Sequence, residues 1–275
     1  MAWLSRFIAA VLVSLITIAI IAQIFDATLL KSSYLDKTAA KAGVYSKLST
    51  DLSIQLSKNI GNNKTVSQAQ VQAIIQKVLT PQLIENKVSA ALGGIEAYYK
   101  GDGPVPTISI NDVIAKLNAS GLPLNIGNSS ITNNIVLTAF VNDKIKTQIK
   151  NFEAVRLYAT LAAVVLFGVL VFLSWEEHRW KIVPDLLIIV SILLGVYATL
   201  FLVGVIEVEK YAKLDPNSNE FTAIANDFAK TLTHQIGILI AIIAVSLFVI
   251  GVTLRVYLQI KGNNKKQTIS KSSKK

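Results

Sequence analysis

Four long apolar runs without a charged residue constrain this chain more than any other feature. They lie at residues 7–25, 157–175, 186–206 and 235–254. Each is close to the roughly 20 residues that a helix needs to cross about 30 Å of hydrocarbon, and a helix satisfies its own backbone hydrogen bonds in lipid. Composition agrees, because 52% of the residues are hydrophobic and only 16% are charged. The sequence therefore predicts an all-α integral membrane protein with four transmembrane helices.

The distribution of Lys and Arg predicts how the chain crosses the membrane. Residues 255–275 carry seven basic residues and no acid, whereas residues 207–233 carry three basic residues against five acids. Because basic residues next to spans favour the cytoplasm, we expect both chain ends inside and residues 26–156 outside. The first run is then a retained anchor rather than a signal peptide, since no small-residue cleavage pattern follows it.

Aromatic and basic side chains fit this orientation, because indole rings and cations favour the membrane interface. The residues predicted to anchor the chain at the inner surface are Trp3, Trp175, Arg179, Trp180, Lys181 and Arg255. Residues 174–181 are interpreted as a cytoplasmic turn. The alternative is a metal site or docking patch at Glu176, Glu177 and His178, which is disfavoured because consecutive residues on a helix point in different directions.

These patterns divide the chain into inner, spanning and outer segments. The predicted segments are a cytoplasmic N-terminus (1–6), a first span (7–25), an extracytoplasmic helical domain (26–156), a second span (157–175), a cytoplasmic turn (176–185), a third span (186–206), an extracytoplasmic helical hairpin (207–234), a fourth span (235–254) and a tail (255–275). The tail is basic and polar, so we expect it to be disordered. Its Lys261, Lys265 and Lys266 could contact anionic lipid headgroups.

Apolar residues at three- and four-residue steps predict that the outer domain is mainly helical. One helix is expected over residues 29–42, closed by Gly43, and a second follows with an apolar stripe over residues 45–56. Thr65 and Gln68 fit a capping box that opens a third helix.

Further signals predict the elements of the outer domain that follow the third helix. Thr80 with Pro81 fits the start of a helix, which residues 100–106 should end. Residues 107–110 and 133–141 are expected to be short strands, and Asn111 could cap a helix between them.

Two helices are predicted to pass from the outer segments into the membrane. No Gly or Pro occurs between Asn142 and Gly168, so one unbroken helix should enter the second span. After the third span, residues 215–219 should form a turn, and an apolar face from Phe221 to Phe228 should lead into the fourth span.

The residue inventory excludes several kinds of active site. The chain has no Cys, and neither of its two His lies within residues 26–156. A thiolate zinc site or a Ser-His-Asp triad therefore cannot be built on the outer domain. The apolar runs also lack the Asp, Glu, Lys and Arg that ion-coupled transporters place inside their bundles. We predict no enzyme activity, no cofactor and no metal site.

Carboxylates remain as candidates for acid–base chemistry outside the membrane. The obvious outer candidates are Glu85 with Glu96 and Asp102 with Asp112. We interpret all four as solvated surface, because nothing in the sequence brings them into one pocket. His234, at the outer edge of the fourth run, is interpreted as an interfacial polar residue rather than as a pH sensor.

Three segments of the outer domain carry a resemblance. They read AGVYSKL, VLTPQLIENKV and YYKGDGPVP. With one anchor before the outer domain and three spans after it, the chain resembles a group of four-span bacterial membrane proteins of uncharacterised function. Its span order is also similar to that of MacB- or FtsX-type ABC membrane subunits, which relay motion across the bilayer. It departs from them in having only about six residues before the first run.

The leading hypothesis is a non-enzymatic protein of a bacterial plasma membrane. Its outer domain would bind a protein or envelope component, and the protein would be an accessory subunit of a larger membrane complex. We expect no nucleic-acid partner. The alternatives are an oligomeric channel or lipid-handling protein, since uncharged spans can line a pore when copies assemble, and a relay partnered with a separate ATPase. A membrane enzyme would depend on the carboxylates alone.

Overall fold

The computed structural model describes the backbone of residues 2–60, 67–101, 103–121, 134–136, 143–173, 182–212 and 220–272. Most of these residues are helical. Four helices are long and apolar enough to cross a membrane, and the candidate spans are Phe7–Thr28, Asp143–Phe172, Ile182–Gly204 and Thr222–Lys261. The prediction of an all-α chain with four such helices is confirmed.

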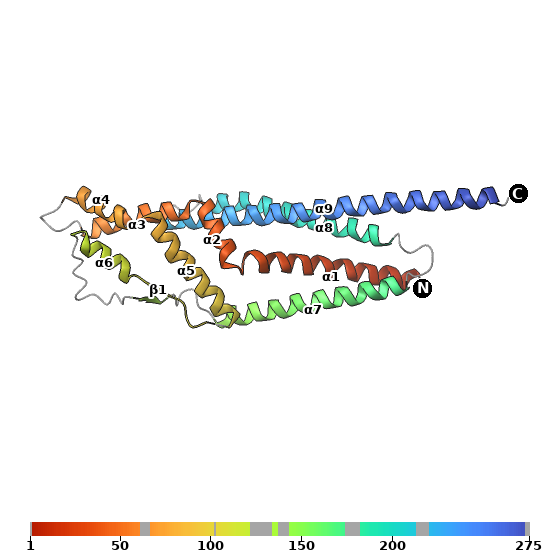
Figure 1. Ribbon diagram of the computed structural model, residues 1–275, viewed down its shortest axis with the longest axis horizontal. Helices are drawn as coiled ribbons and strands as arrows, with labels where there is room; N and C mark the ends of the chain where they lie inside the picture. Colours follow the sequence, from red (N-terminus) through yellow and green to blue (C-terminus); the bar gives the residue numbers. More distant parts are fainter. Residues whose placement is uncertain are drawn as a thin grey trace. The chain divides into compact units, whose positions relative to one another are not determined.

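The helices gather into two compact units. The first, which we call the span unit, contains Met1–Phe25, Phe152–Gly204 and Thr233–Lys275. The second, which we call the lobe, contains Asp26–Asn151 and Val205–Leu232. Four helices have residues in both units: α1 (Ala2–Thr28), α7 (Asp143–Leu173), α8 (Ile182–Ala212) and α9 (Glu220–Ser272) (Figure 1). The unbroken helices predicted to enter the second and fourth spans are therefore present.

Close approach of α8 and α9 depends on two glycines of α9. A Cβ atom added to Gly237 would lie 3.0 Å from Leu202, and one added to Gly251 would lie 2.9 Å from Ile188. Buried Ile240 and Ala244 lie between the two glycines. This heptad-like spacing of small and apolar residues is typical of left-handed helix packing in membranes.

Helix α7 packs through a narrow seam. Ala159 and Ala163 are both buried, and Leu170 continues the seam. Large apolar side chains elsewhere on α7 are exposed, with 77% of Phe172 accessible. A bilayer would cover such an apolar face, so this exposure suits a spanning helix. At the other end of the span unit, the ring of Phe25 in α1 (Ala2–Thr28) lies 5.9 Å from that of Phe201 in α8.

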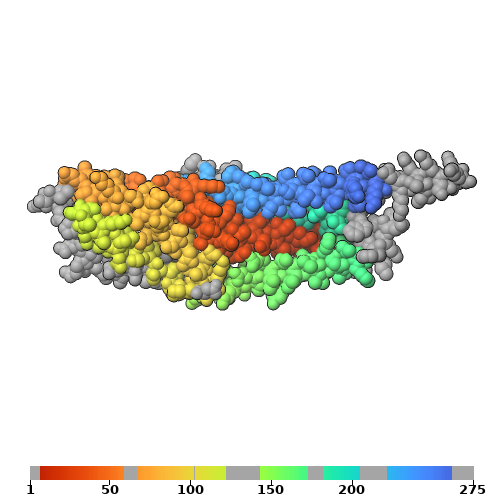
Figure 2. All heavy atoms as spheres, viewed as in Figure 1, coloured from red at the N-terminus to blue at the C-terminus, as the bar shows by residue number. Residues whose placement is uncertain are grey.

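The lobe has its own hydrophobic core. Its helices are α2 (Ser32–Lys41), α3 (Val44–Ile60), α4 (Gln68–Val78), α5 (Pro81–Lys100) and α6 (Asn111–Ala119), and they are joined by the first part of α9. The largest fully buried side chains here include Ile75 and Leu117, and Ile224 of α9 packs against the same cluster. Figure 2 shows the orange to yellow-green atoms of α3 to α6 as one continuous body.

Helix ends in the lobe follow local chemistry. Gly43 and Gly101 have φ values of +68° and +89°, the left-handed conformation that ends a helix and suits glycine. The Thr80 hydroxyl accepts a hydrogen bond from the Leu83 amide at 3.3 Å, with Pro81 at the first helical position. These predicted ends are confirmed.

Two predicted caps are wrong by one or two residues. The capping box that opens α4 is formed by Ser67 and Gln70 rather than by Thr65 and Gln68. Both pairs match the motif, so the pattern alone could not choose between them; Thr65 lies outside the described residues. Asn111 is the first residue of α6, and Ile110 occupies the N-cap position without a side-chain bond.

A small sheet accompanies the helices of the lobe. Strand β1 (Thr107–Ser109) pairs antiparallel with β2 (Asn134–Val136), with Ile108 opposite Ile135. The predicted strand at 107–110 is therefore present, and the described part of the 133–141 segment is the strand that pairs with it. The remainder of that segment lies outside the described residues.

The basic tail is a correction to the sequence analysis. We expected residues 255–275 to be disordered, but α9 continues through them to Ser272. Two physical factors favour this outcome. The segment contains no Pro, and its cations lie at the C-terminal end of the helix, where the helix dipole stabilises positive charge. The predicted turns at 174–181 and 215–219 lie outside the described residues.

Candidate functional site

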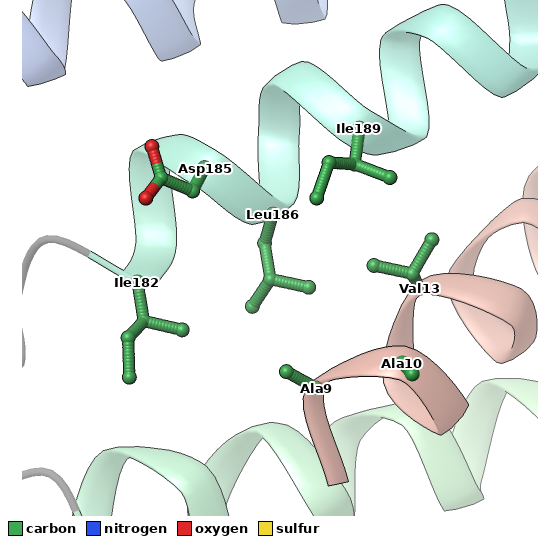
Figure 3. A pocket seen from close by; sticks show the side chains of 7 residues that line it. All are labelled: Ala9, Ala10, Val13, Ile182, Asp185, Leu186 and Ile189. Carbon is green, nitrogen blue, oxygen red and sulfur yellow. The ribbon is translucent and has the colours of Figure 1, made fainter. Parts of the chain in front are cut away.

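An apolar groove lies between α1 and α8 in the span unit. We call it the α1–α8 groove; its lining residues are Ala9, Ala10, Val13, Ile182, Asp185, Leu186 and Ile189. Its volume is about 390 Å³, within the range of roughly 300–1,000 Å³ usual for ligand pockets. Figure 3 shows Ile182 and Leu186 of α8 on the side facing Ala9 and Val13, and the Asp185 carboxylate pointing away from α1.

A smaller polar cavity adjoins the groove at Asp185. Its volume is about 180 Å³, and it is lined by Pro184, Asp185, Arg255, Leu258 and Gln259. The Arg255 Nη1 atom lies 3.2 Å from the Asp185 Oδ1 atom, and about half of each side chain is exposed. The apolar groove and the ion pair therefore share one residue, Asp185.

The helix packing explains why this ion pair forms. Asp185 lies in the first turn of α8 and follows the buried Pro184. On α9, a Cβ atom added to Gly251 would lie 3.2 Å from the Pro184 carbonyl oxygen. Arg255 comes four residues later, about one helical turn. The missing side chain of Gly251 thus lets Arg255 reach Asp185.

A second, polar hollow lies in the lobe. We call it the α3–α9 cleft; its lining residues are Ser46, Lys47, Thr50, Asp51, Ala223, Ile224 and Asp227. Its volume is about 430 Å³. The Lys47 ammonium forms an ion pair with Asp227 at 2.5 Å, with about half of each side chain exposed. One wall of this cleft belongs to α9, the helix that also contains the fourth candidate span.

Glu96 has a structural role. Its Oε2 atom accepts a hydrogen bond from the Ser32 amide at 2.8 Å, and its Oε1 atom pairs with Lys100. Burial raises the pKa of Glu96, but the bonds from Lys100 and Ser32 outweigh it and lower the pKa to about 2. A carboxylate held ionised in this way stabilises the start of α2 and is unsuited to act as a general acid near neutral pH.

Asp112 and Asp36, two other carboxylates of the lobe, have partners of their own. Asp112 pairs with Lys87 at 2.7 Å, and this contact lowers the Asp112 pKa despite partial burial. The Tyr45 hydroxyl donates a hydrogen bond to Asp36 at 2.5 Å. Burial is the largest of the effects that raise the Tyr45 pKa, and the hydrogen bond to Asp36 and the negative charges of Asp36 and Glu85 raise it further. Asp102 lies outside the described residues.

Polar contacts of Tyr98 join α5 to the start of α7. The Tyr98 hydroxyl donates to Asp143 at 2.9 Å, and the Lys146 ammonium lies 4.3 Å from the centroid of the Tyr98 ring. The bond to Asp143 raises the pKa of the Tyr98 hydroxyl. These contacts fix the point at which α7 leaves the lobe.

The structure describes only some of the predicted interface residues. Trp3 lies in α1, Arg255 forms the ion pair with Asp185, and Lys261 is exposed on α9. Lys265 and Lys266 also lie on α9. The residues outside the described part of the chain are Trp175, Glu176, Glu177, His178, Arg179, Trp180 and Lys181.

Neither the α1–α8 groove nor the α3–α9 cleft was predicted from the sequence. Asp185 and Arg255 are 70 positions apart, and no local pattern links them. The small residues Ala9 and Ala10 and the spacing of Gly237 and Gly251 were the available signals, because small residues mark close helix approach in membranes.

No metal cluster of three His, Cys, Asp or Glu occurs among the residues that the structure describes. Comparisons with protein-family models, with curated proteins and with solved structures find no match to this chain. A functional interpretation therefore depends on the geometry of the α1–α8 groove and of the α3–α9 cleft.

Proposed function

We propose that this chain is a non-enzymatic membrane protein whose lobe binds a protein or an envelope component outside the cytoplasm. It would serve as an accessory subunit of a larger membrane complex. The orientation is proposed from the excess of Lys and Arg after the fourth span, which favours cytoplasmic chain ends in a bacterial plasma membrane.

The observation that carries this proposal is the composition of the α3–α9 cleft. The cleft is polar, open and large enough to hold side chains of a partner. It offers both signs of charge, from Lys47 on α3 and from Asp51 and Asp227. A partner seated there would touch α9 at Ala223, Ile224 and Asp227, so binding would act directly on the N-terminal end of the candidate span Thr222–Lys261.

The cleft can be altered without disturbing the hydrophobic core of the lobe. The core cluster around Ile75 and Leu117 holds α3, α4 and α6 together. The cleft-lining Thr50 is exposed, and it lies on the opposite face of α3 from Leu48 and Leu52, which pack against the core. Replacement of Thr50 should therefore change the cleft and leave the core intact.

Co-purification of the full-length chain tests the proposal. Tagged wild type, Thr50→Trp and Thr147→Trp would be cross-linked in native membranes and extracted in mild detergent. Thr147 is a matched control, because both threonines are exposed and both donate to the carbonyl four residues earlier. We expect a stoichiometric partner with wild type and with Thr147→Trp. Thr50→Trp should reduce recovery of the partner at least about tenfold, because blocking a contact that contributes more than about 1.4 kcal/mol weakens binding by that factor.

Two outcomes would contradict the proposal. One is a wild-type chain that is recovered alone after cross-linking. The other is a partner that is retained equally by both threonine variants, which would place its contact away from the cleft.

A further inference from the structure

We propose that the α1–α8 groove and the Asp185–Arg255 pair form a binding site for one phospholipid with an amine-bearing zwitterionic headgroup, a phosphatidylethanolamine of the surrounding leaflet. One acyl chain would occupy the groove, and the headgroup would lie at the ion pair. This inference does not depend on what the lobe binds.

The groove fits an acyl chain. Apart from Asp185, its lining consists of Ala, Val, Ile and Leu side chains. Ile189 in this lining is 49% exposed, so a ligand that covers it removes apolar surface. Two alanines on α1 leave the space that larger side chains would fill, and the volume of about 390 Å³ is that of a ligand pocket.

The polar end of the site offers one charge of each sign. Arg255 uses its Nη1 atom in the contact with Asp185, and a guanidinium presents five N–H donors in a fixed plane. It can therefore hold Asp185 and a phosphate oxygen together. About half of each side chain is exposed, so a headgroup can reach both charges.

Charge complementarity selects the headgroup. A phosphatidylethanolamine carries a phosphate, which suits Arg255, and a primary ammonium, which can donate hydrogen bonds to the Asp185 carboxylate. A phosphatidylglycerol places a second oxygen-rich group beside Asp185 and offers no cation. A choline headgroup is cationic but has no N–H donor. The pair of Asp185 and Arg255 therefore favours the primary amine.

The depth of the site in the span unit fits a headgroup as well. Asp185 lies in the first turn of α8, and Arg255 is the first cation after the long uncharged stretch of α9. Both therefore lie at the ends of candidate spans, where headgroups meet the hydrocarbon region. The groove continues from Asp185 along α8 to Ile189, towards the middle of the span.

Lipid retention by the full chain tests this site. Wild type and variants would be reconstituted in vesicles of phosphatidylethanolamine and phosphatidylglycerol in equal amounts, extracted in mild detergent and analysed by native mass spectrometry. We expect wild type to retain one phosphatidylethanolamine in preference to phosphatidylglycerol. Asp185→Asn should reduce that preference about tenfold, because a charge-assisted bond to the ammonium is lost. Arg255→Gln should reduce retention of both lipids.

A second pair of variants tests the groove independently of the ion pair. Ala9→Phe fills the groove, whereas Ala241→Phe adds the same ring on α9 at a position of similar partial exposure that does not line it. We expect loss of the bound lipid with Ala9→Phe only. Equal retention by both variants, or a wild type that holds the two lipids without preference, would overturn the proposal. If Asp185→Asn does not fold, as judged by helical circular dichroism, the alanine pair still decides.

Discussion

Glu96 shows how one side chain stabilises two elements of the lobe. It belongs to α5, but its carboxylate accepts a hydrogen bond from the Ser32 amide at the start of α2, 64 positions earlier in the chain. Helix α2 has no side-chain cap of its own, since its N-cap residue is Lys31. A carboxylate near a helix N-terminus also interacts favourably with the helix dipole. Glu96 therefore acts as the cap that the local sequence of α2 does not supply.

Replacement of Glu96 should weaken α2 in a pH-dependent manner. We expect Glu96→Ala to lower the opening free energy of α2 by about 1–2 kcal/mol at neutral pH, as for loss of a helix cap. The folded-state pKa of about 2 lies below the ordinary value of 4.5, so the stabilisation is present above pH 4.5. It should be lost as pH falls from there through about 2. Amide hydrogen exchange of α2 in the full chain measures it.

The control for this experiment is Glu153→Ala. Glu153 is a partly exposed residue of α7 in the span unit, so its replacement should leave the exchange of α2 unchanged. Glu96→Gln should have a smaller effect than Glu96→Ala, because its amide oxygen can still accept from Ser32. A wild-type advantage that stays constant down to pH 2 would contradict the assigned role.

At the scale of elements, Gly251 sets how closely α8 and α9 pack. We expect Gly251→Ala to destabilise the full chain in detergent by about 1–3 kcal/mol, the usual cost of overpacking, because its Cβ atom would lie 2.9 Å from Ile188. Gly195→Ala is the matched control, since its Cβ atom would meet nothing within 4 Å. It should be neutral or stabilising, because alanine favours helix. Thermal unfolding followed by circular dichroism compares the two; equal midpoints would contradict the packing argument.

Helices were predictable from the sequence where apolar spacing and caps agreed. The Thr80–Pro81 start of α5 and the Gly101 end are local signals, and both are present. The start of α4 was misplaced because two overlapping motifs, at Thr65 and at Ser67, satisfy the same chemistry. The helical tail was missed because composition argued for disorder, whereas α9 continues into it from the fourth span.

Tertiary partners were not predictable for a different reason. The contact of Ser32 with Glu96 and that of Asp185 with Arg255 join residues 64 and 70 positions apart. Glu96 was interpreted as solvated surface, because a single sequence contains no information on which helices pack together. The α1–α8 groove likewise exists only once α1 lies against α8.

At the scale of the whole molecule, the proposed orientation can be tested with single cysteines, because the chain has none of its own. Lys58→Cys places a thiol on an exposed position of α3 in the lobe, and Ser270→Cys places one on the tail. A membrane-impermeant maleimide should label Lys58→Cys in intact cells and Ser270→Cys only after lysis. The reverse pattern would invert the orientation and remove the extracytoplasmic assignment of the lobe.

The ion pair between Arg255 and Asp185 also affects the position of α9 along its own axis relative to α8. Between Lys230 and Arg255, α9 contains no Asp, Glu, Lys or Arg, so its uncharged stretch alone does not fix how deeply the helix is inserted. A slide of one turn, about 5.4 Å, would separate Arg255 from Asp185 and draw a cation into hydrocarbon. The pair therefore favours one axial register of α9 against α8.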